Sequence, residues 1–361
     1  MKRKILSTLL CTVMTVTILA GCGSSNDNGP AEVAGETAEE AGETAENSSE
    51  TAEVDEAQKL TFGYLINDMS HEWYQNIVKG AQARASEVNV ELLTADAAMD
   101  VSKQVSQAEN MITQGVDALI ITPIDVSALA NVIAEAKEAG IPVISESNVI
   151  EGAVTYVGID NVSASKQAGI WFAEYAKENG IDPQILIVGQ PAYADCRQRV
   201  EGFKAGMDES GIEYTIVQEV DGNGSKETSL EVSQDAITAH PEVNVIFGIN
   251  DNSATGGMAA YKEAGLDESA LTVIGFGFEG VVGREALLGD TPYKAAVAMF
   301  PDYMGVSLID AAVKAAKGED LPDNYESGTV VITKDNFSDF YAEDGDNYIT
   351  NFDAIRALMD K

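Results

Sequence analysis

The stretch HEWYQ (71–75) combines a metal-binding residue type with two adjacent aromatic rings. It begins like the zinc-protease pattern H-E-x-x-H, in which two histidines one helical turn apart hold the metal. Its fifth residue is Gln75, and the only other histidine, His240, lies far along the chain. We therefore predict no metal site. Trp73 and Tyr74 remain, and their flat faces suit either the C–H faces of a sugar ring or an ordinary core.

A second stretch, GFGFEG (275–280), formally matches the dinucleotide-binding pattern G-x-G-x-x-G. That reading needs an acid at the end of the next strand, where it would hold the ribose. The next apolar run, 293–299, ends in Met299 instead, and Glu279 inside the motif would face the pyrophosphate. We therefore predict no nucleotide and no other cofactor.

One further residue has a chemistry suited to catalysis. Cys196 lies beside Arg197 near a predicted helix start, a setting that can lower a thiol pKa, but no histidine partner is visible. Our prediction is that the chain is not an enzyme. An exported enzyme using Cys196 or Glu279 stays as the less favoured alternative.

Amides, hydroxyls and aromatic rings follow the predicted strands instead. Such a collection suits a neutral polyhydroxyl ligand, whose hydroxyls both donate and accept hydrogen bonds. The candidate ligand-binding residues are Asn67, His71, Trp73, Tyr74, Ser147, Asn148, Arg197, Asn250, Glu279 and Met299. Some of these residues have simpler explanations. Trp73 or Tyr74 can belong to the core, and His71 can shape its loop without contacting a ligand. Arg197 can join a surface ion pair, and Asn250 or Asp251 can cap a helix.

The elements that would position these residues alternate along the chain from Leu60 onward. The apolar runs are nearly continuous, as in parallel strands buried on both faces by helices. Strands are predicted at 60–66, 90–95, 117–122, 141–146, 184–188, 213–219, 243–249, 271–275 and 293–299. Helices are predicted at 73–87, 101–114, 126–139, 163–178, 195–209, 226–239 and 253–264, and a short amphipathic one in TNFDAIRALM (350–359). Two runs of such units predict two doubly wound lobes, whose ligands bind beyond the carboxyl ends of the strands.

The N-terminal residues read as a targeting segment followed by a tether. MKRK and the apolar run after it end at Cys22, in a stretch that resembles a bacterial lipoprotein signal, with lipidation of Cys22; an ordinary secretory signal is the simpler alternative. Residues 23–58 then repeat ETAE without large apolar side chains at heptad positions, which indicates a disordered acidic tether and not a coiled coil. Only Cys196 would remain as a free thiol, so no internal disulfide can form.

The overall charge narrows the choice of partners. The chain has 361 residues, with 22 Lys and Arg against 59 Asp and Glu, for a net charge of −37. Such a chain repels phosphate backbones, so we predict no nucleic-acid partner.

From Leu60 to about Asp335 the chain resembles the type I, ribose/galactose-like, periplasmic sugar-binding proteins of ABC importers. The resemblance rests on GAQARASE, QGVDALIITPID, AKEAGIPVI, VGIDN, RVEGF, TAHPEVNVIFGIND, VIGFGF and VAMFPDYMG, which occur in family order. It implies an α/β fold of two doubly wound parallel-sheet lobes with a hinge, and a sugar bound between them. The implied lobes are 59–160 plus 300–328 and 161–299 plus 329–361, after a signal peptide (1–22) and the tether (23–58).

The resemblance also implies roles for individual residues. Trp73 and Tyr74 correspond to paired aromatics that sandwich the sugar, and Asn67, Arg197 and Asn250 to polar contacts. Other positions depart from the ribose binders. Ser147 and Asn148 stand where an Asp-Arg pair is usual, Gly277 stands where an acid is usual, with Glu279 as its substitute, and Met299 replaces a glutamine.

Together these observations predict a lipoprotein that captures a monosaccharide or polyol other than ribose. It would be a monomer, held on the outer face of the cell membrane (or in the periplasm) by a lipid on Cys22, and would deliver its ligand to ABC permease subunits. A sugar sensor that presents its ligand to a membrane receptor or kinase is the alternative.

Overall fold

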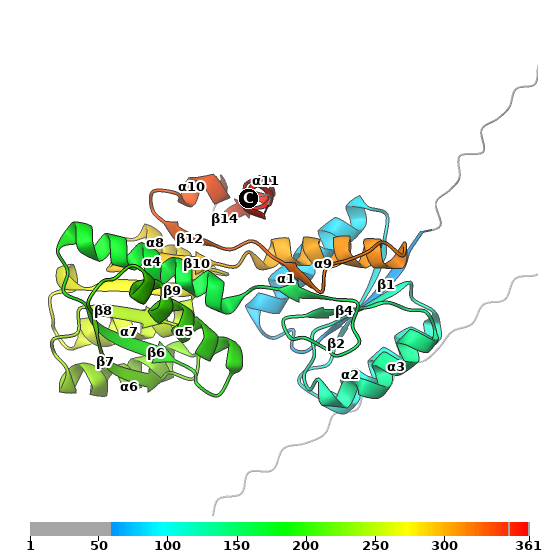
Figure 1. Cartoon of the computed structure of the whole chain (residues 1–361), viewed down its shortest axis with the longest axis horizontal. Coiled ribbons are helices and arrows are strands. Elements are labelled where there is room, and N and C mark those ends of the chain that lie inside the picture. The colour runs from blue at the N-terminus through cyan, green and yellow to red at the C-terminus, as the bar shows by residue number, and fades with distance from the viewer. Residues whose placement is uncertain (1–58, 346, 360–361) are drawn as a thin grey trace, which may run out of the picture. The chain divides into compact units, whose positions relative to one another are not determined.

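The computed structural model describes residues 59–345 and 347–359. The predicted signal peptide, its lipidated Cys22 and the acidic tether all lie outside these residues. Within the described part, helices and strands alternate along the chain, and most of the strands form two six-stranded sheets (Figure 1).

The first sheet has the strand order β11-β5-β4-β3-β1-β2, and all its neighbours are parallel. Its strands are β1 (Thr61–Ile66), β2 (Glu91–Asp96), β3 (Ala118–Ile121), β4 (Val143–Glu146), β5 (Thr155–Gly158) and β11 (Asn324–Glu326). Its helices are α1 (Glu72–Glu87), α2 (Val101–Gln114), α3 (Ala130–Glu138) and α9 (Pro301–Ala316). We call this sheet and these helices the first lobe.

The second sheet has the order β12-β10-β9-β8-β6-β7, parallel except for the edge strand β12. Its strands are β6 (Gln184–Gly189), β7 (Thr215–Asp221), β8 (Val245–Gly248), β9 (Thr272–Gly277), β10 (Tyr293–Ala298) and β12 (Val330–Thr333). The second lobe adds the helices α4 (Asn161–Asn179), α5 (Ala194–Glu209), α6 (Lys226–Ala239), α7 (Asp251–Glu263) and α8 (Val281–Leu288).

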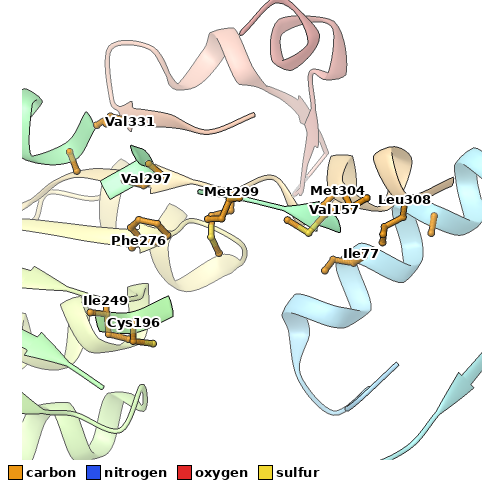
Figure 2. Packing of buried hydrophobic residues seen from close by; sticks show 14 of the residues in the cluster. Ile77, Val157, Cys196, Ile249, Phe276, Val297, Met299, Met304, Leu308 and Val331 are labelled. Atoms are coloured by element: carbon orange, nitrogen blue, oxygen red, sulfur yellow. The ribbon is translucent and has the colours of Figure 1, made fainter. Parts of the chain in front are cut away.

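The central strands are buried along their whole length, as nearly continuous apolar runs predict. Every residue of β3, β4, β8 and β9 is buried, because helices cover both faces of a parallel sheet. One buried cluster includes residues of both sheets; Figure 2 shows Phe276 and Val297 from the second lobe, with Val157 and Ile77 from the first. The predicted α/β class with two parallel sheets is confirmed.

Helix α1, which carries the aromatic pair, packs tightly on α9. A Cβ on Gly80 of α1 would collide with the carbonyl oxygen of Asp302, and one on Gly305 of α9 would collide with the carbonyl oxygen of Ile77. Glycine at both positions lets the two backbones approach closely. This contact fixes the orientation of α1 and therefore of the side chains at its N-terminal turn.

The chain passes between the sheets three times: after β5, after β10 and between β11 and β12. Strand β5 was not predicted, because its four residues lack a long apolar run. The predicted C-terminal helix is present as α11 (Phe352–Met359), and its Ile355 is buried. Before it lie the one-turn helix α10 (Phe337–Phe340) and the hairpin of β13 (Tyr341–Asp344) and β14 (Asn347–Thr350).

Candidate ligand-binding site

The turn after β1 brings three predicted residues together. Asn67 Nδ2 donates a hydrogen bond to the Tyr74 hydroxyl at 2.9 Å. Burial, with a smaller effect of nearby carboxylates, raises the pKa of Tyr74 to about 12, so its hydroxyl stays neutral. His71 contacts the same ring edge-on, with 5.9 Å between the centroids. The turn therefore presents one connected polar and aromatic surface.

His71 is the N-cap of α1. Its Nδ1 accepts a hydrogen bond from the Trp73 backbone N–H at 3.2 Å, which satisfies one of the donors left free at a helix start. The loop-shaping role that the sequence left open is therefore the one seen, and contact of His71 with a ligand stays a prediction. Trp73 and Tyr74 are half-buried, with part of each packed on the buried cluster.

The end of β4 holds Ser147 and Asn148. Ser147 is half-buried and has φ +61, in the left-handed region that non-glycine residues rarely adopt. Its hydroxyl donates to Glu146, a fully buried carboxyl group. Asn148 is exposed. The sequence alone does not single out Glu146, because the role of a carboxyl group at the end of an apolar strand depends on partners that are distant in sequence.

The two arginines of α5 have different surroundings. Arg199 donates to Asn161 Oδ1 at 2.9 Å and to the Ile249 carbonyl at 3.0 Å, and its guanidinium lies 4.4 Å from the centre of the Phe276 ring. Arg197, the residue predicted from the sequence, is exposed and donates to the Pro191 carbonyl at 2.6 Å. Arg199 therefore holds parts of the second lobe together, whereas contact of the exposed Arg197 with a ligand stays a prediction.

Neither Asn250 nor Asp251 is free of structural bonds, although the sequence left one of them available. Asn250 is the N-cap of α7: its Oδ1 accepts from the Ser253 N–H at 2.7 Å and its Nδ2 donates to the Gly224 carbonyl at 3.0 Å. Asp251 is buried and accepts from the Tyr293 hydroxyl at 2.5 Å. Burial raises the pKa of Asp251 to about 7.

Glu279 occupies the space that an acid at position 277 would use. Its Oε2 lies 2.7 Å from the point where a Cβ on Gly277 would stand, and the Met299 methyl lies 3.9 Å from that point. Met299 is buried, and its N–H donates to the Gly277 carbonyl at 3.1 Å. Burial first, then the negative charge of Asp251, raises the pKa of Glu279 to about 8. The role of Glu279 as a substitute for that acid stays a prediction.

Two observations connect the residues of the two lobes. Asn76 Nδ2, one turn along α1 from the aromatic pair, donates to the Glu279 carbonyl at 3.0 Å. The charge of Asp195 on α5 contributes to the raised pKa of Tyr74. Asn148 and Arg197 are exposed, and among the described residues no hydrogen bond joins either of them to another predicted site residue.

Two further observations concern a metal site and a cysteine nucleophile, and a third concerns a surface depression. Among the described residues no three His, Cys, Asp or Glu side chains are grouped to hold a metal ion. Cys196 is buried, and burial raises the pKa of its thiol to about 11, opposite to the lowering that a nucleophile needs. A depression of about 490 Å³ near Val116, Ile141 and Gly318 lies at the amino ends of β3 and β4, away from the candidate residues.

Comparisons with known proteins show the family of the chain. A family profile described as periplasmic binding protein domain matches residues 62–320. The chain belongs to the periplasmic binding protein family. The ribose import binding protein of Escherichia coli (strain K12) is 27% identical over 278 residues, which cover 76% of this chain and 91% of that protein.

Two solved structures are similar over nearly their whole length. One is an ABC transporter periplasmic solute binding protein from Actinobacillus succinogenes with bound D-allose: 26% identical, TM-score 0.69, covering 78% of this chain and 100% of that one. The other is an ABC transporter solute binding protein from Mycobacterium smegmatis with bound glycerol: 28% identical, TM-score 0.65, covering 79% and 98%. Each of these relatives is named as a binding protein and not as an enzyme.

Family membership indicates an extracytoplasmic location. Over residues 59–345 and 347–359, none of the helices has the length and apolar character that a membrane crossing requires.

Proposed function

We propose that this chain is the substrate-binding component of an ABC importer and that it captures a monosaccharide or related polyol between its two lobes. One observation carries the proposal: Trp73 and Tyr74 lie half-buried beside Asn67 at a strand end, with Glu279 joined to the same helix through Asn76. The names of the relatives, which bind ribose, D-allose and glycerol, support this ligand class.

The proposed binding mode follows from the chemistry of these side chains. Trp73 and Tyr74 would stack on the ring, and an aromatic side chain buries ~150–250 Å² when fully enclosed. Arg197 would donate charge-assisted hydrogen bonds to ligand hydroxyls, about 1.5–3 kcal/mol each. Contacts with both lobes would favour a closed state, because only differential affinity shifts such an equilibrium.

The polar contacts argue for a ligand other than ribose. Met299 is buried and offers no strong hydrogen-bonding group, and Ser147 and Asn148 carry no charge. Asn250 and Glu279 would supply the amide and the carboxyl group on the second lobe. We infer that the ligand places an apolar C–H face, and not a hydroxyl, against Met299.

The remaining parts of the proposal concern the rest of the chain. The lobes would be 59–160 plus 300–328 and 161–299 plus 329–361, with a hinge at the three crossings. Cys22 would carry the lipid anchor, residues 23–58 would be the tether, and the protein would act as a monomer with ABC permease subunits. Replacement of Cys22 by Ser should release the protein from membranes.

A thermal-shift screen of the purified chain against pentoses, hexoses and cyclitols tests the function. A ligand present at 100 times its Kd stabilises the folded state by about 2.7 kcal/mol, which raises the Tm by several degrees. Incubation with each hit, followed by NMR of the sugar, should return it unchanged. Chemical turnover of a hit would contradict the binding-protein proposal and favour an enzyme.

A further inference from the structure

A buried carboxyl group lies beside the first-lobe part of the candidate site. Glu146 is the last residue of β4, and its side chain is fully buried. Thr122 Oγ1 donates to its Oε2 at 2.5 Å, and the Ser147 hydroxyl donates to its Oε1. Burying a carboxyl group is costly unless hydrogen bonds compensate it, and such groups concentrate at functional sites.

The hydrogen bonds around Glu146 run across neighbouring strands of the first sheet. Thr122 lies just after β3, and its Oγ1 is 3.5 Å from the hydroxyl of Tyr64 on β1. On the other side, the Tyr156 hydroxyl of β5 donates to the Ser147 carbonyl at 3.4 Å. Glu146 is therefore the centre of a polar layer at the carboxyl edge of β1, β3, β4 and β5.

Ser147 is the residue that this layer holds in place. Its φ of +61 is unfavourable for a side chain with a Cβ, so surrounding bonds must maintain it. Its N–H donates to the Val157 carbonyl at 3.2 Å, and its hydroxyl donates to Glu146. Loss of the bond to Glu146 would leave the side chain of Ser147 without its partner.

We propose that Glu146 is a positioning residue: its ionised carboxyl group holds Ser147 in the ligand-binding geometry, and a proton on Glu146 weakens ligand binding. This inference rests on the proposed function and on Ser147 as a ligand contact. It assigns a role to a residue that would not itself touch the ligand.

The surroundings of Glu146 bring its pKa close to neutral pH. Burial raises the pKa of Glu146 to about 7, and the bonds from Ser147 and Thr122 offset part of that rise. The titratable groups that feel its charge come from three elements: Tyr64 on β1, Tyr74 on α1 and Tyr156 on β5, whose pKa values rise partly because of it. Asp195 on α5 acts on Tyr74 and Tyr156 from the second lobe.

Calorimetric titration of the best-binding sugar at pH 6 and pH 8 tests the proposal. Hydrogen bonds to charged groups exceed neutral ones by about 1 kcal/mol, so wild-type affinity should fall about fivefold at pH 6. E146Q, which keeps the shape but cannot ionise, should bind weakly at both pH values and lose the part of the pH dependence that Glu146 causes, leaving only the part due to Glu279, whose pKa is about 8. The control is S145A, because Ser145 is the buried neighbour on β4 whose hydroxyl has no hydrogen-bond partner within residues 59–345 and 347–359. It should behave as wild type.

An E146Q variant with the wild-type pH dependence would overturn the proposal. If E146Q does not fold, S147A decides, because it removes the link between the Glu146 carboxyl group and the ligand. A smaller pH dependence of affinity than in wild type supports the proposal, and the full wild-type pH dependence overturns it. Wild-type binding that does not vary between pH 6 and 8 refutes this inference alone. A folded wild-type protein that binds no sugar refutes the proposed function, and the inference with it.

Discussion

Replacement of Asp251 by Asn should flatten the pH dependence of folding stability. Asp251 is buried at the start of α7, where the Tyr293 hydroxyl donates to it at 2.5 Å. Burial raises its pKa from the ordinary 3.8 to about 7, although Tyr293 and the backbone N–H groups of Phe278 and Glu279 oppose the rise. The folded state therefore holds a proton that the unfolded chain releases at lower pH.

The direction of the effect follows from linkage. A carboxyl group with a raised pKa contributes full stability below its unfolded pKa, and this contribution is lost as the pH rises through the folded value. The difference between 3.8 and about 7 is worth on the order of 4 kcal/mol in total. Roughly 2 kcal/mol of this falls between pH 5.5 and pH 8.5.

Urea unfolding at these two pH values measures the effect. Wild type should be less stable at pH 8.5 than at pH 5.5, and D251N should lose about 2 kcal/mol less over this interval. Glu279 adds to the difference, because the charge of Asp251 contributes to its raised pKa. The control is D125N: hydrogen bonds from Ser127 lower the pKa of this exposed carboxyl group, so it stays ionised throughout. Equal pH dependence in D251N and wild type would refute the reasoning.

Three further substitutions test how the site is held. Y74F removes the acceptor of the Asn67 amide, so ligand affinity measured by calorimetry should fall about fivefold, for a loss of about 1 kcal/mol; unchanged affinity would contradict this contact. R199M should lower the free energy of unfolding by about 1.5–3 kcal/mol, whereas R197M should change mainly the ligand affinity. The reverse pattern would mean that Arg197 stabilises the fold and Arg199 binds the ligand. G80A should destabilise the fold by about 1–3 kcal/mol through overpacking between α1 and α9, and so lower the Tm. An unchanged Tm would show that the two helices do not approach so closely.

The fold was predictable because its strands are apolar and its helices amphipathic. A run such as DALIIT predicts a buried strand, and β3 (Ala118–Ile121) lies inside it. Two short strands of the first sheet were not predicted: β5 has four residues and the edge strand β11 has three, and too few side chains carry their pattern. Their existence depends on the neighbouring strands.

The site was predictable as a region but not in its bonds. Position after β1 correctly grouped Asn67 with Tyr74, because both belong to the short connection between β1 and the first turn of α1. The different surroundings of Arg197 and Arg199, two residues apart on one helix, depend on where α5 begins. The role of Glu146 depends on Thr122, which lies just after the neighbouring strand β3 and is distant in sequence. Such partners emerge only from the packed structure.

Calorimetric titration of wild type and W73A with the best sugar from the screen tests the central claim most directly. We predict 1:1 binding by wild type and at least a tenfold loss of affinity in W73A, because the variant lacks one stacking face while most of its buried cluster is intact. Wild-type affinity in W73A, or folded wild-type protein that binds none of the pentoses, hexoses and cyclitols, would contradict the account.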